Sequence, residues 1–410
     1  MNGVAPQVSR TEFIGLMAML MSLLALSIDS MLPALSHIGA SLNVQDPNAN
    51  QLIIGFIFIG MALGFMLYGP LSDSYGRKKA IYLGVVIFLL GNLISIYAND
   101  LNTMLFGRVL QGFGAAACRV VTLAMIRDKY EGREMARIMS LIMVLFIIVP
   151  TLAPSVGQAI LWFASWRAIF WFLLLFGLLA TVWLHWRQPE TLAEDKRLDF
   201  TLANVFAGIK ETLSNPEARA YTLSAGILFG AFIGYLSSSQ QLFQIEYGLG
   251  DSFALYFGGL ALTIGISSFI NSKLVMHFEM ETLCIASLSI ITCLSLVFYL
   301  YSSRVSGNPS IESVSVYLSL MFLCFGPLFG NFNAMAIRSL GHIAGVASSV
   351  VNSLQTIVSV VIGGYIGQQY DGTINPLILG FLLCSLMTLI IAVYVRLALS
   401  NKAVIKGNNS

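Results

Sequence analysis

The feature that most constrains this chain is a series of twelve long apolar runs. They span residues 13–35, 52–71, 80–98, 103–126, 139–161, 168–186, 221–242, 253–272, 283–301, 314–337, 343–369 and 375–395. Each is near the length of about 20 apolar residues that a helix needs to cross a bilayer. Only 10% of the 410 residues are charged, against about 25% in a typical soluble domain. The sequence therefore predicts an all-α membrane protein with twelve transmembrane helices.

Composition also excludes several classes of function. The formal charge of +2 gives no support for nucleic-acid binding. The five cysteines all lie in apolar stretches, so neither a disulfide framework nor a zinc site is expected. No nucleophile–base set or metal-ligand cluster is present, so we expect no enzyme and no cofactor. The apolar N-terminal segment lacks a convincing cleavage site and is read as retained.

The positive charges predict how the chain crosses the membrane. Of the 22 Lys and Arg residues, eighteen fall on one side, two lie within spans, and only Arg167 and Arg304 fall on the other side. Because Lys and Arg accumulate in cytoplasmic loops, both termini are expected to be cytoplasmic.

The longest polar stretch, residues 187–219, divides the spans six and six. We expect an N-terminal six-helix bundle at 1–187, a cytoplasmic linker at 188–218 and a C-terminal six-helix bundle at 219–410. Apolar residues in the linker recur at helical spacing, which predicts an amphipathic helix on the inner leaflet. These residues are Leu198, Leu202, Val205, Phe206, Ile209 and Leu213. A linker helix joining the bundles is favoured over a partner-binding site.

A short charged segment, residues 69–79, joins the second and third runs and reads GPLSDSYGRKK. We call it the signature loop. Gly69 would let helices pack closely, Gly76 belongs to the same pattern, and Asp73 suits a helix N-terminus, whose partial charge favours an anion. Arg77 is placed to reach Asp128 at the inner end of the fourth span. Such contacts would latch one access state, although the three cations would also serve as topology anchors.

Asp29 is the only acid well inside a span. At 1.5 Å per residue it lies about 24 Å beyond Phe13, in the outer half of the membrane. An ionised carboxylate at that depth is costly unless it is paired, hydrated or protonated, so Asp29 is a candidate proton carrier. The alternative is a structural carboxylate bonded to a neighbouring helix.

Arg108 and Arg119 share one face of the fourth span with Gln111, because eleven residues correspond to about 20° of helical rotation. Arg108 lies at a depth close to that of Asp29, so if their helices are neighbours the two would pair when Asp29 is ionised; the alternative role of Arg108 is to lock helices together. Arg119 lies near the inner end, where it would have a functional role or simply extend to cytosolic water.

The fifth span contains Pro150, Pro154 and Gly157. Two prolines four residues apart bend a helix, and a glycine allows close helix approach. A passive kink and a moving gate are both compatible with this pattern.

The signature loop resembles that of the major facilitator superfamily. Other stretches resemble its drug:proton antiporters of the Bcr/CflA type: IDSMLPAL around Asp29, RVLQG from Arg108, and AGVASS from Ala344. The segment from Ala153 to Gly157 resembles the antiporter signature of the fifth span, but Ala153 and Gln158 stand where that signature has glycine.

The resemblance implies two six-helix bundles around a central cavity and alternating access. It implies cavity-lining residues in the first, fourth, seventh and tenth spans. Besides Asp29 and Arg108, the candidates are Met21, Gln111, Arg119, Phe232, Tyr235, Gln240, Phe325, Asn331 and Asn333.

The resulting hypothesis is a proton-coupled antiporter of the bacterial inner membrane that exports small amphipathic compounds, with Asp29 and Arg108 coupling the proton. The proton would be the coupling ion, and the partners a small-molecule substrate and membrane lipid. We expect a monomer. One alternative is a transporter of the same fold that carries a physiological metabolite or siderophore, including by import. The other is a membrane sensor that transports nothing.

Overall fold

The structure is a computed structural model, and it describes residues 9–197 and 201–407. Helices make up this part of the chain, and it contains no strand. Eleven of its helical segments are long and apolar enough to cross a bilayer, and α6 carries a shorter apolar stretch, Ile148–Phe163. The all-α membrane fold is confirmed. Helices suit this environment because lipid offers no partner for backbone N–H and C=O groups.

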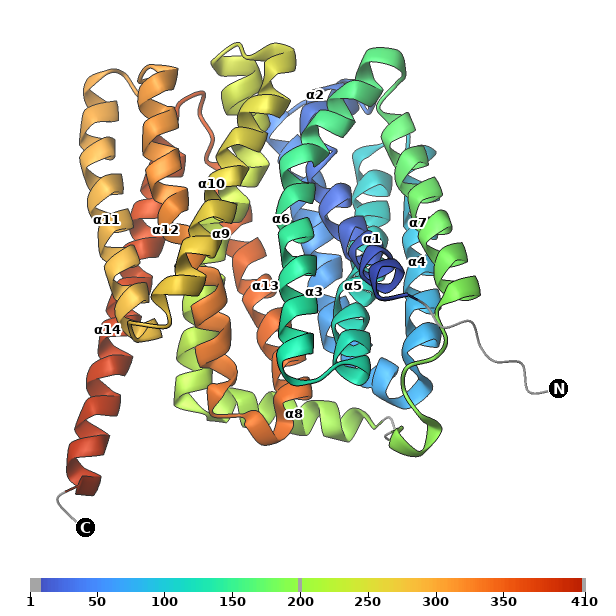
Figure 1. The fold of residues 1–410 in the computed structure, drawn as a ribbon. Coiled ribbons are helices and arrows are strands. Elements are labelled where there is room, and N and C mark those ends of the chain that lie inside the picture. Colours follow the sequence, from blue (N-terminus) through green and yellow to red (C-terminus); the bar gives the residue numbers. More distant parts are fainter. Residues whose placement is uncertain (1–8, 198–200, 408–410) are drawn as a thin grey trace. The chain divides into compact units, whose positions relative to one another are not determined.

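Figure 1 shows the order of the helices along the chain. The long helices of the first half are α1 (Arg10–Asp29), α3 (Leu52–Tyr75), α4 (Arg77–Ile96), α5 (Leu101–Lys129), α6 (Gly132–Phe163) and α7 (Arg167–Arg187). Those of the second half are α9 (Pro216–Ser239), α10 (Phe253–Leu274), α11 (Met280–Arg304), α12 (Ile311–Arg338), α13 (Ala344–Gln368) and α14 (Asn375–Gly407).

Shorter helices break or connect the spans. They are η1 (Leu32–Ala34), α2 (Leu35–Ser41), η2 (Pro47–Gln51), η3 (Glu194–Lys196), α8 (Leu202–Ser214), the π-helical turn η4 (Gln240–Glu246), η5 (Gly250–Ser252) and η6 (Gly341–Ile343). α8 confirms the helix expected in the linker. Its Phe206 and Leu213 are exposed, and Leu198 lies outside the described residues.

The chain forms two compact units. The first contains Met1–Phe206 and Leu249–Gly259, and the second contains Ala207–Gly248 and Leu260–Ser410. The start of α10 therefore packs with the first unit. The predicted boundaries at residues 187 and 219 stay a prediction.

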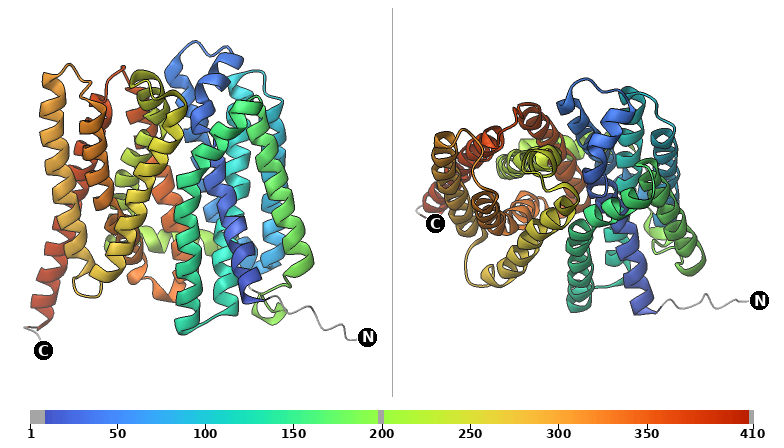
Figure 2. Two further views of the ribbon diagram at one scale, coloured as in Figure 1. Left: turned by 45° about the horizontal axis from the view of Figure 1, so that its top comes forward. Right: turned by 90° about the horizontal axis from the view of Figure 1, so that it is seen from above.

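The helices of each unit pack by the same scheme. In the first unit α1 contacts α5, α6 and α7, and α4 contacts α5 and α7. In the second unit α9 contacts α12, α13 and α14, and α11 contacts α12 and α14. The end-on view in Figure 2 shows the helices of each unit gathered side by side. These contacts correspond pairwise between the two units, as expected for two parallel repeats.

Glycines let α3 and α5 approach until their backbones touch. A Cβ atom at Gly112 would meet the Ile57 carbonyl, and one at Gly60 would meet the Val109 carbonyl. Close approach of this kind is a common source of van der Waals contact between membrane helices.

Replacing Gly112 with alanine should therefore lower stability by about 1–3 kcal/mol, the usual cost of overpacking. Gly364→Ala is the matched control, because Gly364 lies inside α13 with open space around its Cβ position. Because alanine has a higher helix propensity than glycine, Gly364→Ala should leave stability unchanged or raise it by up to about 1 kcal/mol. Thermal unfolding of the purified proteins in detergent measures both. Equal effects of the two substitutions would contradict the close contact of α3 and α5.

Candidate functional site

Asp29 lies where the first helix breaks. α1 ends at this residue, and Leu32–Ala34 form a 3-10 turn before α2 begins. Pro33 has no N–H, so it cannot continue the helical bonding to the Asp29 carbonyl. The Asp29 residue is only 5% exposed. The acid is thus buried beside backbone that is no longer regular helix.

The expected pairing of Asp29 with Arg108 does not occur in this structure. Within the described part of the chain, no hydrogen bond or ion pair reaches the Asp29 carboxylate. Arg108 does reach α1, the helix that ends at Asp29, but its N–H groups donate to other acceptors.

The Arg108 side chain is fully buried and bonds three separate groups. Its Nη2 donates to the carbonyl of Ser27 in α1 at 2.8 Å, and its Nε donates to the carbonyl of Ile53 in α3 at 3.0 Å. Its Nη1 donates to the Gln111 side-chain oxygen at 2.7 Å. The guanidinium thereby joins α1, α3 and α5 through neutral acceptors.

Gln111 extends this network to a fourth helix. Its Nε2 donates to Oδ1 of Asn92 in α4 at 2.7 Å, and Asn92 Nδ2 donates to the Phe88 carbonyl at 2.8 Å. Gln111 and Asn92 are both fully buried. In the structure the Gln111 side chain therefore links Arg108 to Asn92, and its lining of a cavity stays a prediction.

Gly157 brings α6 against the break in α1. A Cβ atom at Gly157 would meet the carbonyl oxygen of Ser30, and would lie 2.9 Å from the Ser30 carbonyl carbon. α6 runs as one helix through Pro150 and Pro154. Gly157, one of the residues expected to shape the fifth span, therefore contacts the backbone of Ser30, the residue directly after Asp29.

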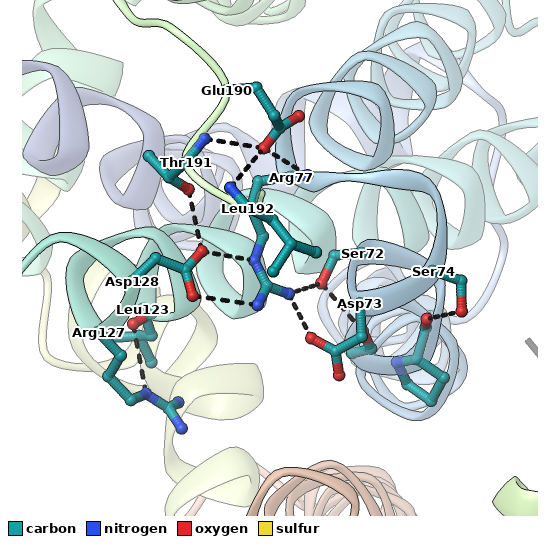
Figure 3. A network of polar contacts seen from close by, with 12 residues as sticks. Ser72, Asp73, Ser74, Arg77, Leu123, Arg127, Asp128, Glu190, Thr191 and Leu192 are labelled. Atoms are coloured by element: carbon teal, nitrogen blue, oxygen red, sulfur yellow. Dashed lines mark hydrogen bonds and ion pairs between the residues drawn. The ribbon is translucent and has the colours of Figure 1, made fainter. Parts of the chain in front are cut away.

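The signature loop forms a polar network of its own, shown in Figure 3. The Arg77 guanidinium donates to Asp128 twice, from Nε at 2.8 Å and from Nη2 at 3.2 Å. Its Nη1 bonds Asp73 and, at 2.8 Å, the Ser72 hydroxyl. The expected ion pair of Arg77 with Asp128 is present, and the side chain of Arg77 is almost fully buried.

Glu190 caps the N-terminus of α4, a role that sequence reasoning did not predict. Its carboxylate accepts from the backbone N–H groups of Arg77 and Lys78, both at 3.0 Å. It also accepts from the N–H groups of Thr191 and Leu192. The position expected for Asp73, against a helix N-terminus, is thus taken by Glu190. Asp73 instead lies in the last turn of α3 and bonds Arg77.

Gly76 makes room for this contact. Its φ of +100° lies in the region that favours glycine, and a Cβ atom there would lie 2.8 Å from Glu190 Oε2. The Gly69 carbonyl accepts from the Ser72 hydroxyl at 2.9 Å. The Asp128 carboxylate also accepts from the Thr191 hydroxyl at 2.9 Å, so the start of the linker is tied to the same network.

Comparison with known proteins gives the family. The profile described as Major Facilitator Superfamily matches residues 16–363. The chain belongs to the major facilitator superfamily.

Curated relatives of this superfamily member include named resistance proteins. It is 27% identical over 382 residues to the bicyclomycin resistance protein homolog of Haemophilus influenzae, covering 91% of this chain and 93% of that protein. It is 30% identical over 341 residues to the multidrug resistance protein MdtL of Citrobacter koseri, covering 80% and 81%. It is also 29% identical over 357 residues to the uncharacterised transporter YdgK of Bacillus subtilis, covering 86% and 87%.

Solved structures agree in fold. The D-xylose–proton symporter matches with a TM-score of 0.69 and 16% identity, covering 93% of this chain and 97% of that one. The human organic anion transporter MFSD10 matches with a TM-score of 0.66 and 15% identity, covering 92% and 98%. At these identities the likeness concerns the fold alone. Family and relatives together make this chain a multi-pass transporter of the superfamily and not an enzyme.

Three residues expected to line a cavity in this transporter meet in one aromatic cluster between α9 and α12. Phe232 stacks on Tyr235, with ring centroids 5.9 Å apart, and lies 6.1 Å from Phe325. Phe322 and Phe329 of α12 pack edge-on against Phe232. Tyr235, Phe322 and Phe325 are fully buried, so in this structure the rings pack α9 against α12.

The other expected lining residues lie apart from this cluster. Met21 is buried in α1, and the Arg119 guanidinium lies over the Phe65 ring at 5.5 Å. Asn331 exchanges hydrogen bonds with Asn271 of α10 at 3.2 and 3.3 Å. Gln240 opens the π-helical turn and donates to Gln244 at 2.8 Å, and Asn333 lies two residues beyond Asn331 in α12.

Two functional candidates missed by sequence reasoning had visible signals. Asn92 is a lone amide in a charge-free span, and Glu190 is an acid that follows the sixth span directly. Asn92 accepts from Gln111 of α5 and Glu190 accepts from the N-terminus of α4, so their roles required knowing which helices are neighbours.

Removing the Arg77 side chain should slow transport by about tenfold or more while leaving substrate affinity nearly unchanged. The lost bonds to Asp128, Asp73 and Ser72 are charge-assisted, worth about 1.5–3 kcal/mol each, and each 1.4 kcal/mol on a barrier is tenfold in rate. Arg77→Ala is compared with Lys79→Ala, which removes the same charge from an exposed neighbour. Transport and equilibrium binding are measured on one proteoliposome preparation. Loss of binding in folded Arg77→Ala protein would argue against a conformational role.

Proposed function

We propose that this chain is a proton-coupled antiporter that exports small amphipathic compounds by alternating access. The observation that carries the proposal is Asp29: a buried acid at a helix break, with no bonded partner in the described part of the chain. The names of two relatives, a bicyclomycin resistance protein homolog and a multidrug resistance protein, support export of foreign compounds.

Asp29 is the group that takes up and releases the coupling proton. An ionised carboxylate inside the membrane is costly, and binding a proton removes that cost. Substrate and proton then compete for one state of the protein, so that uptake of a proton from outside favours release of substrate there. Loss of the proton to the inside resets the carrier.

Arg108 acts on Asp29 as a fixed positive charge. Its donors are already bonded to Ser27, Ile53 and Gln111, so it does not neutralise Asp29 in this conformation. A small shift of the α1 break would bring the carboxylate toward the guanidinium and favour the ionised form. The Ser27 carbonyl that Arg108 binds lies two residues before Asp29, so such a shift needs no rearrangement of α5.

The signature loop network latches one conformation. Arg77 joins the ends of α3, α4 and α5, and Asp128 with Thr191 adds the start of the linker. Each transport cycle must form this network again, so its bonds lower the free energy of the latched state and of the step that returns to it, and their loss slows turnover.

The rival within the superfamily is a transporter that imports a metabolite or siderophore. This alternative stands because Ala153 and Gln158 occupy positions where the antiporter signature of the fifth span has glycine. The direction of accumulation under an imposed pH gradient separates the two, since an antiporter accumulates substrate in the more acidic compartment.

We further propose a bacterial inner-membrane location with both termini in the cytoplasm and a monomeric carrier surrounded by lipid. The eighteen-to-two distribution of Lys and Arg supports this orientation. Reporters fused after Lys406 and within the linker should both read cytoplasmic. A periplasmic reading at either position would reverse the orientation.

Asp29→Asn should abolish coupling without unfolding the protein. The amide is close in shape to the protonated carboxyl and carries no exchangeable charge. We expect the variant to bind ligands yet fail to accumulate them against a gradient, while Asp29→Glu retains partial activity. Substrate-driven proton movement in proteoliposomes, with a panel of amphipathic dyes and antibiotics, is the measurement. Proton exchange by Asp29→Asn at the wild-type rate would return Asp29 to a structural role.

A further inference from the structure

The second unit contains a three-residue ion network that the proposed mechanism does not use. Arg338, in the last turn of α12, donates from Nη2 to Glu217 at 2.5 Å and from Nη1 to Glu281 at 2.8 Å. Glu217 and Glu281 lie in the first turns of α9 and α11. One guanidinium therefore joins the ends of three helices, and we call Glu217, Arg338 and Glu281 the acid–arginine brace.

The brace stands at the counterpart of the signature loop network. In the first unit, Arg77 begins the third long helix and Asp128 lies in the last turn of the fourth. In the second unit, Glu281 lies in the first turn of the third long helix and Arg338 in the last turn of the fourth. The two repeats thus share the position of the ion pair but reverse its charges.

The reversal changes how each pair interacts with its own helices. A helix N-terminus favours an anion and a helix C-terminus favours a cation. In the brace all three charges have the favoured placement. In the signature loop network, Arg77 is a cation at an N-terminus, and Asp73 and Asp128 are anions at C-terminal ends, so every charge has the opposed placement. Glu190 partly offsets this by accepting from the Arg77 and Lys78 amides.

Neighbouring contacts hold the brace together. Asn215 caps α9 by accepting from the Glu217 and Ala218 N–H groups, and its Nδ2 donates to the Ser339 hydroxyl at 2.9 Å. Beneath these bonds, Ala218 packs with Leu340 and Ala347 in a buried apolar cluster. The start of α9 is therefore fastened to the end of α12 by charge, hydrogen bonds and apolar contact.

We propose that the acid–arginine brace is a permanent clamp on the second unit, while the signature loop network is the part that opens during transport. Arg338 is then a positioning residue: it fixes the spacing of α9 and α12, the helices that carry the aromatic cluster around Phe232. The inference rests on the proposed alternating access, because only a protein that changes conformation needs one network that opens and one that stays closed.

Hydrogen exchange of the full-length protein in lipid nanodiscs, followed by mass spectrometry, tests the clamp without any substrate. Arg338→Gln should speed exchange in the first turns of α9 and α11 by about threefold or more, because local opening there no longer has to break the two ion pairs. Arg396→Gln is the matched control. It removes the same charge from a loose pair with Glu279 at 3.7 Å, beside the first turn of α11, and should leave exchange unchanged. Wild-type exchange rates in Arg338→Gln would overturn the clamp.

A second comparison tests permanence. Asp29→Asn, a mimic of the protonated acid, should alter exchange at the start of α4, around Arg77 and Lys78, and leave the first turns of α9 and α11 unchanged. Equal changes at both places would show that the brace opens too and would overturn the inference. If Asp29→Asn changes neither place, the proposed proton-driven switch fails, while the comparison of Arg338→Gln with Arg396→Gln still decides whether the brace restrains α9 and α11.

Discussion

The Arg108 guanidinium is buried within the first unit and donates to two backbone carbonyls and one side-chain amide. A cation at such a site is tolerated only where acceptors surround it, because lipid provides none. Its acceptors come from α1, α3 and α5, and Gln111 carries the network on to Asn92 in α4. The packing of these four helices therefore depends on two features: the bonds of the Arg108 side chain, and the glycines that let α3 and α5 touch.

The same bonds explain why Asp29 is left available. Arg108 is satisfied by neutral groups, and α1 ends beside Pro33 with the carboxylate unbonded in the described part of the chain. Had the two formed an ion pair, a proton would have to displace a guanidinium to bind. An acid near a cation that is already satisfied can exchange its proton at smaller cost, which suits a carrier that must load and unload in each cycle.

Sequence reasoning reached some of these features and missed others for identifiable reasons. The spans, the α8 helix and the contact of Arg77 with Asp128 followed from apolar length, helical spacing and charges at span ends. The pairing of Asp29 with Arg108 is absent from this structure, because Arg108 donates to the carbonyls of Ser27 and Ile53, which depth along a helix does not reveal. Glu190 and Arg338 were missed because their partners lie in helices whose packing the sequence alone does not give.

The central claim is that Asp29 binds and releases a proton while Arg108 stays bonded to its neutral acceptors. Infrared difference spectroscopy of the protein in lipid, titrated with pH, tests this directly by comparing the wild type with Asp29→Asn. The account predicts a protonated-carboxyl band in the wild type that disappears as the pH rises and is absent from the variant. Identical carboxyl bands in both proteins, or a wild-type spectrum without such a band at any pH, would contradict it.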